Sequence, residues 1–141
     1  MKTNRRERCR SILEKAGMHR TIPRQEIIEV LLQSKSPVTQ EQVGEKIRGK
    51  APDKVTIYRT LESLVKSGLV HKAFLHNRTW HYELADNCSE FQCHPHFTCK
   101  KCGDTHCMTG VSVPMAGKPA KGYIIHRQRV QIEGICPKCN V

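Results

Sequence analysis

The chain has few aromatic residues and no long hydrophobic run. Three Phe, three Tyr and one Trp account for 5% of its 141 residues, and hydrophobic residues account for 38%. This composition supports one domain or two small ones with modest cores. No apolar run reaches the roughly 18 residues of a membrane span, and no charged-then-apolar leader opens the chain. We therefore expect a cytoplasmic protein with no membrane partner.

Cysteine, by contrast, is abundant. Four of the eight cysteines form two C-x-x-C pairs, Cys99 with Cys102 and Cys136 with Cys139. In a reducing compartment such pairs indicate metal thiolates rather than disulfides, and two pairs suit one tetrahedral structural Zn²⁺ per chain. A redox dithiol and unmetallated core cysteines are the alternatives. A redox pair would normally lie near a βαβ unit, which the pattern does not show.

A second group of metal-binding side chains precedes the first pair, in the segment CHPHFTCKKCG at residues 93 to 103. His94 and His96 alternate around Pro95, so on a strand both imidazoles would point to one face and could chelate one ion. Two coordination positions would remain open. The candidates for these positions are His71, His76, His81, Glu83, Cys88, Cys93, His106 and Cys107. Thiolate with imidazole suits zinc, whereas iron and manganese sites favour nitrogen and oxygen ligands.

Positive charge is concentrated in the first half of the chain. Residues 1 to 72 hold sixteen Lys and Arg against eight Asp and Glu, a net +8, whereas residues 73 to 141 hold eight against five, a net +3. A basic N-terminal half is the electrostatic footprint of a nucleic-acid-binding domain. Charge by itself is also compatible with a basic, solvated surface.

The same half reads as a series of four helices. Apolar stripes and capping residues predict helices over residues 4–16, after Thr21, after Thr39 and after Asp53. On the last of them Thr56, Tyr58, Arg59 and Glu62 face away from the apolar stripe, and Lys54 stands at its start. A short helix, a turn and such a second helix predict a helix-turn-helix reader of DNA. An ordinary helical domain with a solvated Tyr-Arg face is the alternative.

Two strands are expected around His76-Asn77-Arg78, which would form the wing of a winged helix. At this point the residues resemble the ferric uptake regulator (Fur) family, through the motifs TIPRQEIIEVLL, VTIYRTLESLVKSGLVHK, HPHFTCKKCG and GICPKC. The resemblance implies an α+β protein with a winged helix-turn-helix DNA-binding domain at residues 1–84, a hinge at 85–92 and a small α/β dimerisation domain at 93–141 that carries the four-cysteine zinc. It also implies a homodimeric, metal-responsive repressor of metal-uptake genes that binds double-stranded operator DNA.

Within the family, the chain is most similar to the zinc-uptake branch. That resemblance implies a regulatory Zn²⁺ held by His71, Cys88, His94 and His96, with Cys93 as the alternative sulfur ligand. The iron-sensing and peroxide-sensing branches usually have Asp between the two histidines, where this chain has Pro95. We assign DNA binding to the following residues: Arg24, Lys54, Thr56, Tyr58 and Arg59.

Three other functions are weighed against zinc sensing. The chain could sense iron, manganese or peroxide as other members of the family do, or act as a constitutive zinc-stabilised winged-helix protein. An enzyme with a small-molecule substrate is disfavoured, because a catalytic zinc needs an open coordination position and a nearby general base. The family's last strand normally carries a His and a Glu where this chain has Gln128 and Gln131, so no third metal is expected. Pro114, Gly117 and Pro119 interrupt the region where relatives have a longer helix, which favours a shortened dimerisation domain.

Overall fold

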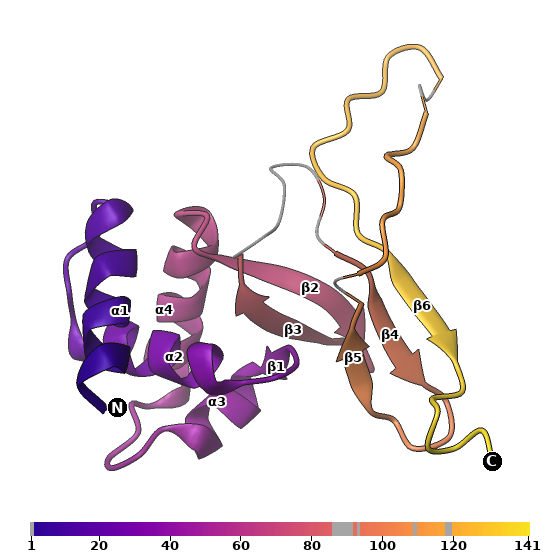
Figure 1. Cartoon of the computed structure of the whole chain (residues 1–141). Coiled ribbons are helices and arrows are strands. Elements are labelled where there is room, and N and C mark those ends of the chain that lie inside the picture. Colours follow the sequence, from indigo (N-terminus) through magenta and orange to yellow (C-terminus); the bar gives the residue numbers. More distant parts are fainter. Residues whose placement is uncertain (1, 86–91, 93, 109, 118–119) are drawn as a thin grey trace. The chain divides into compact units, whose positions relative to one another are not determined.

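The computed structural model describes residues 2–85, 92, 94–108, 110–117 and 120–141. The chain divides into two compact units, residues 1–85 and 86–141, and each is described by itself (Figure 1). The first unit contains α1 (Lys2–Lys15), α2 (Ile22–Gln33), β1 (Val38–Thr39), α3 (Gln40–Lys46), α4 (Lys54–Lys66), β2 (Val70–His76) and β3 (Thr79–Leu84). The second contains β4 (His96–Cys99), β5 (Thr105–Cys107) and β6 (Gln131–Gly134). None of the helices described combines the length and apolar character that crossing a bilayer demands.

The core of the first unit lies where α1, α2, α3 and α4 meet β1, β2 and β3. The predicted apolar stripes are confirmed, since Leu13, Ile28 and Leu61 are fully buried in one cluster. Two further members of that cluster, Cys9 and Val30, lie outside the predicted stripes. Burial raises the pKa of the Cys9 thiol to about 11, so this cysteine is a small hydrophobic core residue. The helices are thus packed by a shared apolar centre, which leaves one face of α4 exposed.

Each predicted cap is confirmed by a hydrogen bond from the first turn of its helix. Thr21 Oγ1 accepts from the Arg24 N–H, and Asp53 Oδ1 accepts from the Thr56 N–H at 2.7 Å. Thr39 forms a complete capping box, in which its hydroxyl accepts from Gln42 N–H and its own N–H donates to Gln42 Oε1. The capping box and the two simple caps therefore set where α3, α2 and α4 begin.

Replacing Thr39 with alanine is expected to lower the unfolding free energy of the first unit by about 1 kcal/mol, because an N-terminal N–H of α3 loses its acceptor. Urea titration followed by circular dichroism measures the change. Thr39→Ser keeps the hydroxyl and is the matched control, expected to stay within a few tenths of a kcal/mol of the wild type. Equal losses in both variants would assign the effect to packing rather than to the cap.

Strands β1, β3 and β2 form an antiparallel sheet in that order. The β2–β3 hairpin turns at Asn77 and Arg78, whose φ angles of 49° and 62° are both positive, as a type I′ turn requires. The register shifts between Lys72 and Phe74. Helices α3 and α4 with this hairpin make the first unit a winged helix-turn-helix.

The second unit is built on a small mixed sheet. Its strand order is β5-β4-β6, with β5 antiparallel and β6 parallel to the central β4. Gly103, at φ 77°, closes the tight turn between β4 and β5. The described residues of the 108–130 connection contain no helix, which agrees with the interruption predicted at Pro114 and Gly117. Pro119 lies outside the described residues.

Candidate metal centres and nucleic-acid interface

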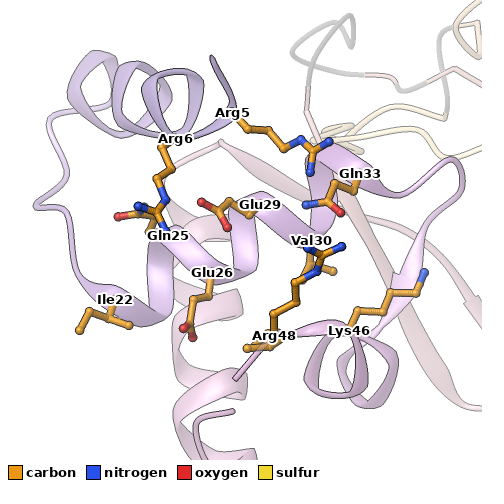
Figure 2. Close-up of a pocket in the computed structure, with 11 residues that line it drawn as sticks. Arg5, Arg6, Ile22, Gln25, Glu26, Glu29, Val30, Gln33, Lys46 and Arg48 are labelled. Atoms are coloured by element: carbon orange, nitrogen blue, oxygen red, sulfur yellow. The ribbon is translucent and has the colours of Figure 1, made fainter. Parts of the chain in front are cut away.

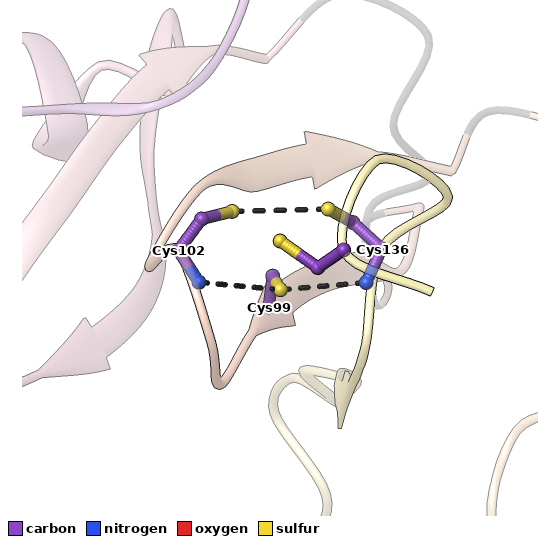
Figure 3. A group of neighbouring side chains, drawn as sticks. Cys99, Cys102 and Cys136 are labelled. Carbon is purple, nitrogen blue, oxygen red and sulfur yellow. Dashed lines mark hydrogen bonds between the residues drawn. The ribbon is translucent and has the colours of Figure 1, made fainter. Parts of the chain in front are cut away.

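The four cysteines of the two C-x-x-C pairs converge at one end of this sheet. Parallel pairing sets Cys99, the last residue of β4, opposite Gly134 of β6, so the turn after each strand delivers its cysteines to the same place. The four sulfurs lie within 4.8 Å of one another, and those of Cys102 and Cys136 are 3.7 Å apart (Figure 3). A tetrahedral zinc with bonds of about 2.3 Å separates its sulfurs by about 3.8 Å. The donor set therefore fits a tetrahedral metal, and none of the six described cysteines forms a disulfide.

The electrostatics of this cluster favour a cation. The backbone N–H groups of Cys102 and Cys136 donate to the Cys99 sulfur at 3.5 and 3.4 Å and lower the pKa of the Cys99 thiol to about 6. The hydrogen bond between Cys139 and Cys136, together with burial, raises the pKa of the Cys139 thiol to about 12. One thiolate is thus stabilised by the backbone, while further ionisation is opposed. A divalent cation is what allows all four sulfurs to ionise, so these cysteines form a metal-binding site.

A second cluster of metal-binding side chains lies on the other end of the same sheet. The ligand atoms of His94, His96 and Cys107 lie within 4.8 Å of one another, and the two imidazole centroids are 4.7 Å apart. His96 of β4 pairs directly with Cys107 of β5, which carries the sulfur to the histidines. His96 is only 1% exposed. Two imidazoles and a thiol within reach of one ion are a soft donor set with room for a further ligand.

The other residues predicted for the regulatory site are distributed as follows. Cys88 and Cys93 lie outside the described residues. His71 belongs to β2, where its Nε2 lies 2.6 Å from Oε1 of Glu83 on the facing strand. A carboxylate in this position fixes the orientation and tautomer of an imidazole, as it does for many metal-binding histidines.

Two alternative ligands have other environments. His81 stacks on Phe74 with ring centroids 4.5 Å apart, and burial lowers its pKa, so it packs as an aromatic residue of the wing. His106 is exposed and precedes Cys107 on β5, so its side chain points to the opposite face of that strand. Among the candidates from the β4–β5 hairpin, Cys107 is the one that the register brings to His94 and His96.

Gln128 takes part in a set of amide hydrogen bonds. Its Oε1 accepts from the Ala116 N–H at 2.6 Å, and its Nε2 donates to the Pro114 carbonyl at 3.1 Å and to Gln92 Oε1. Gln92 and Gln128 also form an isolated parallel β-bridge. The amide bonds of Gln128 thus hold residues 114–116 beside this bridge. An amide contact therefore stands at the position where the resemblance would place a metal-binding histidine.

The candidate DNA-reading face is the solvent side of α4. Tyr58 is 51% exposed and Arg59 is exposed beside it, while Ile57, Leu61 and Leu64 anchor the opposite side of the helix in the core. Thr56 is half-buried. The structure adds one residue that the sequence had not singled out, since Val55 is 55% exposed on the first turn of α4.

Two other predicted DNA-binding residues have contacts within the unit. Arg24 Nη1 donates to the His19 carbonyl at 2.8 Å and so braces the loop between α1 and α2. Lys54 is exposed, and its carbonyl accepts from Gln40 Nε2 at 2.9 Å, which ties the start of α3 to the start of α4. The second bond thus links the first turns of the two helices of the helix-turn-helix.

A cavity of 390 Å³ opens between α1, α2 and the segment after α3, with side chains from all three converging on it (Figure 2). Basic Arg5, Arg6 and Arg48 line it together with acidic Glu26 and Glu29. A phosphate site or a metal-cation site is normally lined by groups of one charge sign. The mixed lining of this cavity matches neither kind of site.

Comparison with known proteins gives a consistent assignment. The chain matches the ferric uptake regulator family over residues 15–131. It is 25% identical over 133 residues to the peroxide operon regulator of Bacillus subtilis (strain 168), covering 91% of this chain and 88% of that protein. It is 28% identical over 144 residues to the ferric uptake regulation protein of Campylobacter jejuni, covering 95% of this chain and 87% of that protein.

Solved structures share the fold. The Helicobacter pylori ferric uptake regulator, which has three functional metal-binding sites, superposes with a TM-score of 0.63 at 20% identity, covering 99% of this chain and 93% of that one. A zinc uptake regulator complexed with zinc and DNA gives 0.62 at 18% identity, covering 95% and 91%. Because the family match spans most of the sequence, the chain belongs to the ferric uptake regulator family, whose members are metal-responsive DNA-binding transcriptional regulators rather than enzymes.

Proposed function

We propose that the protein is a zinc-responsive repressor in the cytoplasm that binds operator DNA as a homodimer and controls metal-uptake genes. The observation that carries this proposal is the convergence of His94, His96 and Cys107 at one end of the β4–β5 hairpin. A thiolate with two imidazoles favours zinc over iron or manganese, which prefer nitrogen and oxygen donors. The four-cysteine site holds a structural Zn²⁺ in the same proposal.

The second site is completed by a ligand from outside the hairpin. Cys88 and His71 are the proposed candidates, and a tetrahedral zinc needs one of them beside the three clustered side chains. His71 is already oriented by Glu83. The proposal thus keeps His94 and His96 of the predicted set and adds Cys107.

Regulation follows from a shift between conformations. When bound, the ion stabilises whichever arrangement of the chain brings its ligands together. The bound arrangement is proposed to present two α4 helices of a homodimer to successive major grooves, about 34 Å apart. A coupling of about 1 to 3 kcal/mol would tighten DNA binding roughly 5- to 150-fold.

The test is operator binding titrated against buffered Zn²⁺, Fe²⁺ and Mn²⁺, together with elemental analysis of the purified protein. Zinc sensing requires two zinc equivalents per chain and DNA affinity that rises with zinc at lower free concentrations than with the other ions. A response to iron or manganese instead would make the protein one of the other sensors of its family. One tightly bound zinc and a flat response would identify a constitutive zinc-stabilised DNA-binding protein.

Replacing Arg59 with alanine is expected to weaken operator binding by about 1 to 3 kcal/mol if the guanidinium reads a guanine edge. Arg59 lies exposed on the solvent face of α4, one turn from the capped end. Competition with operator variants measures whether sequence preference is lost along with affinity. A uniform loss with a shallower salt dependence would identify a phosphate contact instead.

A further inference from the structure

Helix α4 carries an apolar side chain on the first turn of its solvent face. Val55 is 55% exposed, and it shares that face with Tyr58 and Arg59, three and four residues later. Glu62 and Lys66 continue the same face toward the end of the helix. The buried residues of α4 lie on the opposite side. Val55 therefore lies on the face of α4 that is the candidate for DNA binding.

Folding does not explain a valine at this position. Its side chain is excluded from the hydrophobic cluster of the unit, whose α4 members are Ile57, Leu61 and Leu64. A β-branched residue is also a weaker helix former than alanine, because its χ1 rotation is restricted against the preceding turn. The residue thus adds no core packing to α4, and its side chain is available for a contact with a partner.

The first two turns of this face are positively charged, which suits a negatively charged partner. Lys54 and Arg59 flank Val55, and the carboxylate of Asp53 is engaged by the Thr56 N–H at the helix start. DNA is the partner in the proposed function, and the N-terminal residues of a recognition helix are those that reach base edges. In the major groove, the apolar feature of a base edge is the C5-methyl group of thymine.

We propose that Val55 is a specificity-determining residue that contacts a thymine methyl group in each half-site of the operator. The inference rests on the proposed DNA binding by α4. Arg59, one turn further along the same face, would contact a base or phosphate next to this thymine. Val55 and Arg59 would thus contact neighbouring positions of the half-site. A methyl group buried against Val55 is worth about fourfold in affinity per half-site.

The test is a double-mutant cycle between protein and DNA. Duplexes that bind the zinc-loaded full chain are selected from a random library, and each thymine of the selected site is replaced with deoxyuridine, which removes only the methyl group. Wild-type protein is expected to lose about fourfold at one thymine per half-site, or about 16-fold when both are replaced. At that thymine, the V55A protein is expected to bind the thymine and deoxyuridine duplexes with equal affinity. The dependence of its DNA affinity on salt concentration should be unchanged.

Three results separate the possibilities. The V111A protein, which truncates a similarly exposed valine of the second unit, is the matched control and should keep the wild-type sensitivity to deoxyuridine. Equal sensitivity in wild-type and V55A proteins, or no sensitivity in either while sequence-selective binding persists, overturns the role of Val55 and leaves the proposed function standing. Failure to enrich any sequence overturns the proposed function, and the Val55 contact with it.

Discussion

A C136S variant is expected to lose the metal of the four-cysteine site and, with it, the folded structure of residues 86–141. In the described part of this unit, the buried apolar residues are Pro95, Cys99 and Cys136, and the two cysteines, at 1% and 2% exposed, belong to the metal site. Three short strands with so small an apolar centre do not hold a domain of this size together. Structural zinc supplies about 10 to 16 kcal/mol in small zinc domains, so its loss exceeds any other single change considered for this chain.

Elemental analysis and thermal unfolding followed by circular dichroism measure the two parts of this prediction. The helical signal of the first unit should survive in C136S, because its core cluster lies within residues 1–85. Cys9→Ala is the matched control, since Cys9 is a fully buried cysteine of that core. It should lower the stability of the first unit and leave the metal content unchanged. A C136S protein that kept both its metal and its β structure would refute the structural role of the four-cysteine site.

Replacing His96 with alanine is expected to remove the second metal equivalent and the metal-dependent gain in DNA affinity, proposed to be roughly 5- to 150-fold. His96 is the most buried member of its cluster, and it links the sulfur of Cys107 to the imidazole of His94. Its loss leaves two donors of the cluster and the proposed ligand from outside the hairpin, one short of the four that a tetrahedral zinc site needs. Zinc titration with DNA-binding and metal-content readouts follows both effects.

The neighbouring histidine provides the control for this variant. His106→Ala removes an imidazole from the same hairpin but from the exposed, opposite face of β5. It should retain both metal equivalents and the full response to zinc. The H96A protein should still contain the metal of the four-cysteine site, which distinguishes loss of regulation from unfolding. A normal response to zinc in H96A would remove the clustered histidines from the proposed mechanism.

The helical half of the protein was predictable because its signals are local. The caps at Thr21, Thr39 and Asp53 each bond to an N–H within the next three residues, and the apolar stripes repeat within single helices. Cys9 escaped prediction because it lies on a helix whose surface is strongly basic, so no apolar stripe marked it. Val55 escaped because a single exposed valine carries no periodic signal.

The two metal sites differ in how far the sequence could predict them. Paired C-x-x-C motifs predicted the four-cysteine cluster, since four thiols with this spacing have few other uses. Cys107 was one of several candidate ligands in the sequence, and the register of the hairpin is what selects it. Counting outward from the turn that Gly103 closes pairs Thr98 with Thr105 and His96 with Cys107. The resemblance to the family placed Gln128 where relatives have a histidine, but the amide bonds that Gln128 makes depend on the path of residues 114–116.

The parallel pairing of β4 with β6 has a consequence for the order of events during protein synthesis. The central strand of the sheet leaves the ribosome well before the edge strand whose turn carries Cys136, 37 residues after Cys99. Pairings between distant segments form slowly, because a long loop must close first. During that interval the nascent chain exposes the thiols of Cys99 and Cys102 without those of Cys136 and Cys139. The availability of the correct ion during translation therefore helps decide how much of the newly made polypeptide folds.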